Sequence, residues 1–103
     1  MLNLTNGQKV LLNGSAMLGS NAGTANFDFD IGYIFGANPL AAVSGLSYQS
    51  AIVPINTRPC FSTSPIFTAS AAGRYNFVFA VKNTGSPALN INDFSTLTAV
   101  VFN

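Results

Sequence analysis

The sequence predicts an all-β protein whose strands form a sandwich or a barrel within one domain, residues 1–103. Three observations lead to this prediction. Apolar and polar side chains alternate in several short segments, which is the period of a half-buried strand. Turn-forming Gly, Pro and Asn residues separate these segments. Every window of helical length is interrupted by Gly, Pro, Asn or β-branched residues, and the chain contains no Glu.

The clearest strands are predicted at residues 26–33, 74–82 and 95–102. In the first, one face carries Phe27, Phe29, Ile31 and Tyr33, and the other carries Asp28, Asp30 and Gly32. In the second, one face carries Tyr75, Phe77, Phe79 and Val81, and the other carries Arg74, Asn76, Val78, Ala80 and Lys82. The third run is rich in β-branched residues, which favour strands. The first two strands therefore each offer an apolar face to a core.

Weaker strand signals fall at residues 9–12, 46–55, 60–69 and 88–91. Ser64 and Pro65 interrupt the third of these, so we expect a break or an edge strand there. Turns are predicted at residues 13–14, 38–39, 58–59, 72–73 and 83–85. The small and polar residues 14–26 predict a long loop, and residues 37–43 allow one short helical turn at most.

The charge content is low for the surface of an isolated protein. Charged residues make up 7% of the chain, hydrophobic residues 49%, and the formal net charge is +1. Soluble domains typically carry about 25% charged residues, and near-neutral proteins tend to self-associate. We therefore expect a homo-oligomer, because obligate interfaces resemble a domain core cut in half. The alternative is a monomer coated with neutral Asn, Ser and Thr residues.

The same composition disfavours several other partners. Four scattered Lys and Arg residues form no basic cluster, so we expect no nucleic-acid partner. Residues 31–57 carry no charge, but Gly, Pro, Asn and Gln interrupt them, which argues against a membrane span. The first residues lack the basic leader and apolar core of a signal peptide. No phosphate-binding loop is present, and we expect no small-molecule substrate.

Little catalytic chemistry is available to this chain. It has no His and no Glu, which removes the usual general bases and many metal ligands. An enzyme would have to use Asp93 or Cys60 without an adjacent base, so we expect neither catalysis nor a cofactor. Cys60 is the only cysteine, and we expect it to be buried as a small hydrophobic residue.

One group of oxygen ligands invites a metal interpretation. Asp28 and Asp30 share a strand face with Asn26, a spacing that could present oxygens to a calcium ion. Calcium takes about six to eight oxygen ligands, more than one strand offers. We therefore expect no metal site, and a solvated outer face that discourages edge-to-edge pairing.

Aromatic residues are the informative group for interaction. They can fill the core of the sandwich, or a subset near strand ends can face a neighbouring subunit, as aromatic residues do in interface cores. The interface candidates are Tyr33, Phe35, Tyr75, Phe77, Phe79 and Phe102. Sequence alone does not divide these six residues between core and interface.

Two segments carry a family resemblance. Residues 67–79, Phe-Thr-Ala-Ser-Ala-Ala-Gly-Arg-Tyr-Asn-Phe-Val-Phe, resemble the strand of complement-type and tumour-necrosis-factor-like heads in which Gly-x-Tyr-x-Phe follows an apolar lead-in. Residues 93–102 resemble the closing strand of these heads, which are jelly-roll sandwiches assembled as trimers. The resemblance implies a single jelly-roll-like antiparallel β-sandwich and favours a homotrimer. Residues 81–91 also resemble a hairpin of immunoglobulin-like sandwiches.

Short, charge-poor jelly rolls are also similar to the cement or decoration proteins of tailed-phage capsids. This resemblance implies a structural virion protein on the outer capsid surface, which binds the major capsid protein and stabilises the shell. The alternative is a small carbohydrate-binding domain or a receptor-binding fibre head. In that alternative Tyr33, Tyr48 and Asn38 would supply the sugar site.

Overall fold

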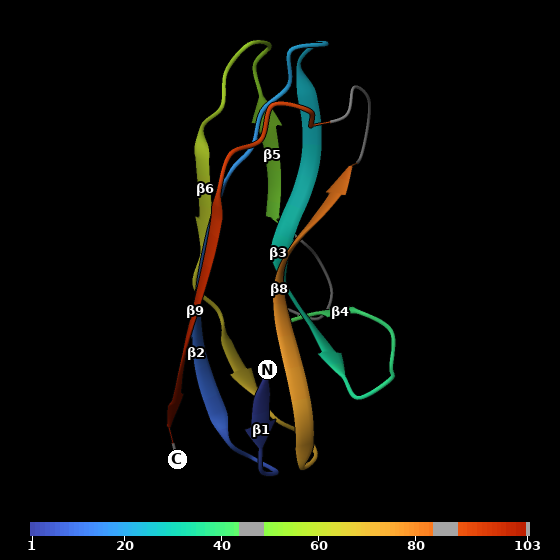
Figure 1. The fold of residues 1–103 in the computed structure, drawn as a ribbon, viewed down its shortest axis with the longest axis vertical. Coiled ribbons are helices and arrows are strands. Elements are labelled where there is room, and N and C mark those ends of the chain that lie inside the picture. Colours follow the sequence, from blue (N-terminus) through green and yellow to red (C-terminus); the bar gives the residue numbers. More distant parts are fainter. Residues whose placement is uncertain (44–48, 84–88, 103) are drawn as a thin grey trace.

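Two antiparallel sheets pack face to face in the computed structural model, which describes residues 1–43, 49–83 and 89–102 (Figure 1). The first sheet contains β1 (Leu2–Leu4), β3 (Ala25–Phe35), β4 (Ala41–Ala42), β5 (Gln49–Val53) and β8 (Gly73–Asn83). The second contains β2 (Lys9–Met17), β6 (Cys60–Thr63), β7 (Ile66–Thr68) and β9 (Ser95–Phe102). This arrangement confirms the predicted all-β antiparallel sandwich.

Each sheet is built around a long central strand. In the first sheet β8 pairs with one edge of β3, and β4 and β5 pair with different parts of the other edge. β1 extends this sheet beyond β8. In the second sheet β9 pairs along one edge of β2, and β6 and β7 share its opposite edge. The chain crosses repeatedly between the sheets, so most neighbouring strands, although not β3 and β4, are far apart in sequence.

The predicted alternation in β3 and β8 is confirmed. The two strands pair antiparallel, with Ile31 opposite Phe79 and Tyr33 opposite Phe77. Except for Val81, which is 40% exposed, the residues of the apolar faces point between the sheets, where burying each large side chain contributes about 1.5–3 kcal/mol. The pattern works because side chains at every second position of a strand share one face.

The core consists of two clusters of buried side chains. One contains Leu4, Val10, Leu12, Ile31, Phe67, Ala69 and Tyr75. The other contains Ala16, Leu18, Ala25, Phe27, Phe29 and Val53. Because Gly14 lies on β2 between them, it is close to both clusters. A Cβ atom at Gly14 would lie 3.2 Å from side-chain atoms of Ile31 and Phe79, so glycine permits this close approach of the sheets.

This close approach explains why the predicted loop at residues 14–26 is wrong. β2 continues through the Asn13-Gly14 pair as far as Met17, and β3 begins at Ala25. The glycine that suggests a turn in the sequence instead lies in mid-strand, where a side chain would be in tight contact with Ile31 and Phe79. The connection between β2 and β3 is therefore much shorter than predicted.

Other boundaries agree with the sequence to different degrees. β9 coincides with the predicted strand, and the predicted break at Ser64-Pro65 separates β6 from β7. Of the strand predicted at 46–55, the described part contains β5. Residues 89–91 form no strand, and residue 88 and the turn residues 84–85 lie outside the described ranges. Residues 37–43 form a turn and β4, while β1 was too short to predict.

The described ranges contain no helix long and apolar enough to cross a membrane.

Candidate functional site

The six predicted interface aromatics occupy different environments. Tyr75 is a core residue, because only 1% of it is exposed and its hydroxyl donates a 2.8 Å hydrogen bond to the Ala71 carbonyl oxygen. Four others are half-buried, namely Tyr33, Phe35, Phe77 and Phe79. Phe102 is exposed on β9. The structure therefore leaves Tyr75 no surface for a partner, and a partner contact by the other five stays a prediction.

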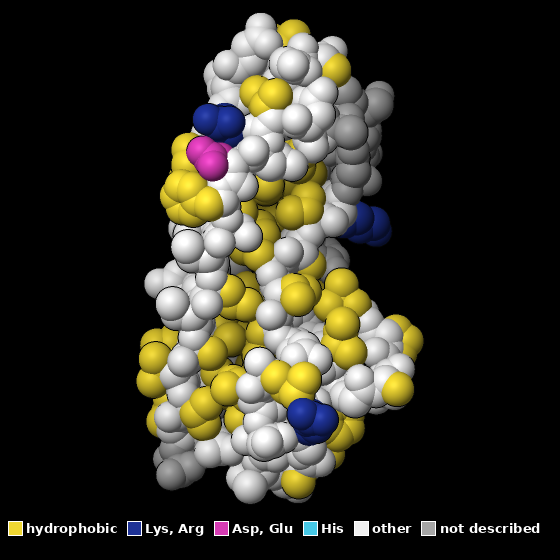
Figure 2. Space-filling view, in the orientation of Figure 1, with side chains coloured by type: hydrophobic (Ala, Val, Ile, Leu, Met, Phe, Trp, Pro, Cys, Tyr) yellow, Lys and Arg dark blue, Asp and Glu magenta, His cyan; other side chains and the backbone are white. Residues whose placement is uncertain are grey.

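One side of the sandwich is open between β8 and β9. The two strands lie next to each other but belong to different sheets, and Figure 1 looks onto this side. Figure 2 shows hydrophobic side chains gathered along a hollow down the middle of the same face, between the positions of β9 and β8. No described strand covers this side, and half-buried apolar side chains next to the core, such as Phe77, Phe79 and Leu97, line it.

The outer edge of β9 has no strand partner within the described residues. The Met17 amide donates to the Phe94 carbonyl oxygen at 3.2 Å, and the Leu12 amide donates in the opposite direction, to Pro65 at 3.0 Å. Backbone groups alternate in direction along a strand, so the odd-numbered residues of β2 face β9. From the register, the even-numbered residues of β9 face β2. The backbone groups that point away from the sheet belong to Ser95, Leu97, Ala99 and Val101.

The nearby edge of β8 is open in the same way. β1 covers this edge only opposite Gly73, Arg74 and Tyr75. The Gly36 amide donates to the Arg74 carbonyl oxygen at 3.2 Å, so the even-numbered residues of β8 face β3. The outward backbone groups belong to Phe77, Phe79 and Val81, which pair with no other strand in the part of the chain that the structure describes.

Exposed apolar side chains accompany these open edges. Phe94 and Val100 are each 59% exposed, although they are large hydrophobic residues. The other exposed large hydrophobic side chains of β8 and β9 are Val78, Val81, Val101 and Phe102. Residues 94–102 contain no charge and no proline, the usual features that protect an edge strand from pairing with another chain. An edge of this kind is suited to strand addition by a protein partner.

Sequence reasoning identified Phe102 but missed the rest of this surface. Val100 and Val101 lie in the segment predicted as a strand, residues 95–102, Phe94 directly precedes it, and the lack of charge in these residues was visible. Which edge of the strand would be unpaired was not visible, because pairing depends on strands far away in sequence. The open edge is therefore a finding of the structure.

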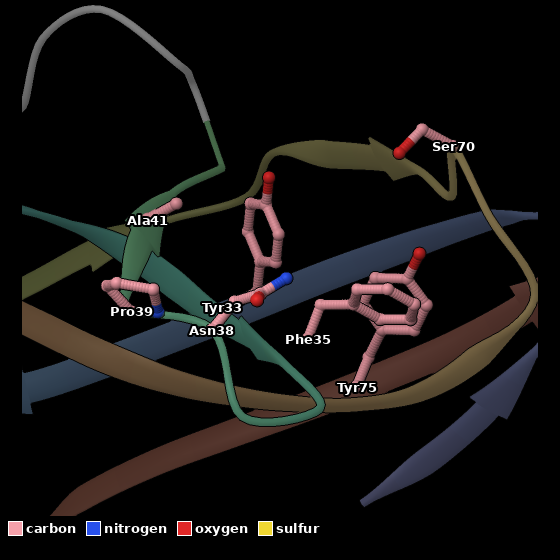
Figure 3. A pocket seen from close by; sticks show the side chains of 7 residues that line it. All are labelled: Tyr33, Phe35, Asn38, Pro39, Ala41, Ser70 and Tyr75. Carbon is pink, nitrogen blue, oxygen red and sulfur yellow. The ribbon is translucent and has the colours of Figure 1, made fainter.

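A second feature is a hollow of about 220 Å³ beside β4. It is lined by Tyr33, Phe35, Asn38, Pro39, Ala41, Ser70 and Tyr75 (Figure 3). In this view Pro39 and Ala41 lie on one side of Tyr33, and Phe35 and Tyr75 lie on the other. The rings of Phe35 and Tyr75 have centroids 4.6 Å apart. Two residues of the alternative sugar site, Tyr33 and Asn38, thus line one hollow, and Tyr48 lies outside the described residues.

The expectation of a solvated outer face at Asp28 and Asp30 is wrong for Asp30. Asp28 is half-buried, whereas Asp30 is only 2% exposed and one of its carboxylate oxygens accepts a 2.7 Å hydrogen bond from the Ile31 amide. Ala80, opposite Asp30, is also buried, so this part of the outer face is covered. No group of three or more potential metal-ligating His, Cys, Asp or Glu residues occurs in the described ranges.

The expectation of a buried Cys60 is also wrong. Its thiol is exposed and forms no disulfide. Phe61 and Thr63 take the inward positions of β6, and Phe61 packs against Phe27 with a centroid distance of 5.0 Å. Since side chains alternate along a strand, Cys60 must point outward.

Comparisons with known proteins do not assign the chain to a family, since no family model, curated protein or solved structure matches it.

Proposed function

We propose that this chain is a structural subunit that acts through protein–protein contacts and performs no catalysis. The observation that carries this proposal is the open side of the sandwich, where no described strand pairs with the outer edge of β9 and apolar side chains lie beside it. An exposed edge without charges or proline favours strand addition and aggregation unless a partner covers it. We therefore expect a partner chain to cover this edge in an assembly.

The assembly that we propose is a virion. In this proposal the chain is a homo-oligomeric decoration subunit that binds the major capsid protein on the outer capsid surface and stabilises the shell. The low charge content and the short sandwich support it, together with the resemblance to capsid decoration proteins. A subunit held between other proteins needs few charges, because neighbouring chains cover surface that would otherwise face water.

Co-sedimentation tests this function directly. The purified chain is mixed with shells assembled from the major capsid protein encoded in the same genome, and bound protein is measured in the pellet. We expect saturable binding at a fixed ratio to the capsid protein and a rise in the temperature at which the shells break. A chain that stays in the supernatant at every concentration, with shells of unchanged stability, would contradict the proposal.

The hollow beside β4 favours a second candidate, a carbohydrate-binding domain. Aromatic rings pack against the apolar faces of sugars, and the amide of Asn38 offers a donor and an acceptor at the same hollow. A glycan array separates this candidate from the first. A sugar ligand should be lost in Asn38→Ala, which changes an exposed residue, and kept in Asn13→Ala, which changes an exposed residue on β2. An array without hits would reject the candidate.

A further inference from the structure

We propose that two copies of this chain pair through the open edges of β9, antiparallel about a two-fold axis at Thr98, and form one continuous sheet. This inference rests on the proposed function as a contact-forming subunit and names one of its contacts. The occupant of the open edge is thus a second copy. A two-fold contact differs from the trimer that the family resemblance implies, and a mass measurement distinguishes them.

The backbone of β9 is self-complementary at this register. Its outward groups belong to Ser95, Leu97, Ala99 and Val101. With the axis at Thr98, Ser95 lies opposite Val101 of the second copy, and Leu97 lies opposite Ala99 of the second copy. Opposed residues of this type exchange two hydrogen bonds in an antiparallel ladder. A shift by one residue would set outward groups against inward ones, and a shift by two would leave an end of the ladder unpaired.

The side chains are compatible with the same register. On the outer face Thr98 would meet its own copy, and Val100 would lie beside Thr96 of the second copy. The exposed ring of Phe94 would lie opposite Phe102 of the second copy, and cross-strand aromatic pairs stabilise sheets. On the inner face Leu97, Ala99 and Val101 of both copies would form one apolar row.

The contact would also cover the neighbouring edge. Because β8 lies on the same side of the sandwich as β9, a two-fold axis at Thr98 brings the β8 edges of both copies toward each other. Val81, exposed in one copy, would then face the second copy. One contact would therefore cover both open edges and the hollow between them.

Charge gives an independent reason to choose a second copy as the occupant. In a two-fold contact each charge near the axis meets its own copy, so a self-pairing edge has to be uncharged there. Residues 94–102 fulfil this condition. The charges next to this run are Asp93 and Arg58, which form an exposed ion pair at 3.6 Å. A strongly charged partner would have no opposite charge to pair with in residues 94–102.

The size of the side is comparable to that of a small protein–protein contact. β9 has eight residues and is about 27 Å long at roughly 3.4 Å per residue. The shorter extents of the molecule are 21 and 19 Å, so the open side is a strip of the order of 500 Å² before surface roughness is counted. Stable interfaces bury about 800 Å² per partner. The projected strip is smaller than this, close to the lower end of specific interfaces at about 600 Å² per partner, and the relief of the side chains adds to it.

Light scattering coupled to size exclusion measures the predicted assembly. We expect roughly 21 kDa, twice the 10.7 kDa mass of one chain. Thr98→Lys places two like charges against each other at the axis, and we expect it to weaken the pair at least tenfold in dissociation constant. Asn13→Lys is the matched control, since Asn13 is the exposed neighbour of Thr98 on β2 and lies one strand farther from the axis. It should leave the pair intact.

Two further variants keep the test decisive if Thr98→Lys fails to fold. Ala99→Pro removes an outward amide that makes no bond to β2, so the fold should survive and the pair should be lost. In a Cys60→Ser background, Thr98→Cys sets two thiols opposite each other at about 4.5 Å between Cα atoms, within disulfide range. Diamide should oxidise them to a covalent dimer, and Val100→Cys, away from the axis, should cross-link far less.

A monomer of 10.7 kDa at submillimolar concentration would overturn the inference, and so would a trimer of roughly 32 kDa. A dimer that ignores Thr98→Lys and Ala99→Pro would overturn it as well. Shell co-sedimentation separates this failure from failure of the proposed function. A monomer that still binds shells rejects the β9 pair and the homo-oligomeric state but keeps the capsid contact, and a dimer that binds no shell rejects the capsid contact.

Discussion

Replacing Tyr75 tests how the core of this sandwich is held together. The Tyr75 ring lies among those of Phe35, Phe67 and Phe77, with centroid distances of 4.6, 5.3 and 6.3 Å. Its hydroxyl donates to the Ala71 carbonyl oxygen at 2.8 Å. The ring and the hydroxyl therefore contribute separately, and two substitutions distinguish them.

Tyr75→Phe removes the hydrogen bond and keeps the ring. Because a net hydrogen bond contributes about 0.5–1.5 kcal/mol, we expect the free energy of unfolding to fall by about 1 kcal/mol. The melting temperature should fall by about 4–8 °C for a domain of this size. Tyr75→Ala also removes the ring and leaves a cavity, which costs about 3–5 kcal/mol for a buried aromatic residue. That loss approaches the whole stability of a small domain, which starts at about 5 kcal/mol.

Urea unfolding followed by circular dichroism, at one fixed protein concentration, measures both variants. Because only 1% of Tyr75 is exposed, Tyr75→Phe should leave the mass in solution unchanged. The reasoning is refuted if Tyr75→Ala lowers the free energy of unfolding by less than about 2 kcal/mol, since removing a packed aromatic ring from a core costs more than that. It is refuted equally if Tyr75→Phe changes the assembly while leaving stability intact.

Three other predictions concern individual positions. Gly14→Val should cost about 1–3 kcal/mol in urea unfolding, because a side chain there would press on the core; a neutral result would contradict the close approach of the sheets. Cys60 should react with a thiol reagent in the native protein as fast as a free thiol, and slow labelling in the absence of denaturant would place it inside. Arg58→Ala and Asp93→Ala should each change the unfolding free energy by less than about 1 kcal/mol, because exposed ion pairs contribute little; a larger loss in either variant would show that the 3.6 Å pair matters.

The strands with strong alternation were predictable because their information is local. Phe27, Phe29 and Ile31 occupy every second position, and this spacing alone places them on one face. The strand at 95–102 was equally clear from its β-branched residues. Gly14 was misread because the same glycine can serve a turn or a close contact between sheets. Only the position of Ile31 and Phe79 across the core decides between the two.

The candidate site was predictable only in part. Phe102 was named from sequence and is exposed, whereas Tyr75 was named for the same reason and is buried. Both are aromatic residues of apolar strands, so their local sequence offers no way to distinguish them. Their difference comes from position, since Tyr75 lies on a strand paired on both edges at that point and Phe102 lies on an edge strand.

The sequence by itself determined the all-β class, the apolar faces of β3 and β8, and the shortage of charge and of catalytic groups. These properties depend on composition and, within the strands, on a period of two residues, both of which can be read from the sequence. The tertiary structure decided that Asp30 is buried, that Cys60 is exposed and that the outer edge of β9 is unpaired within the described residues. The alternation of apolar and polar side chains shows that a strand has two different faces. Strands distant in sequence decide what covers each face and each edge.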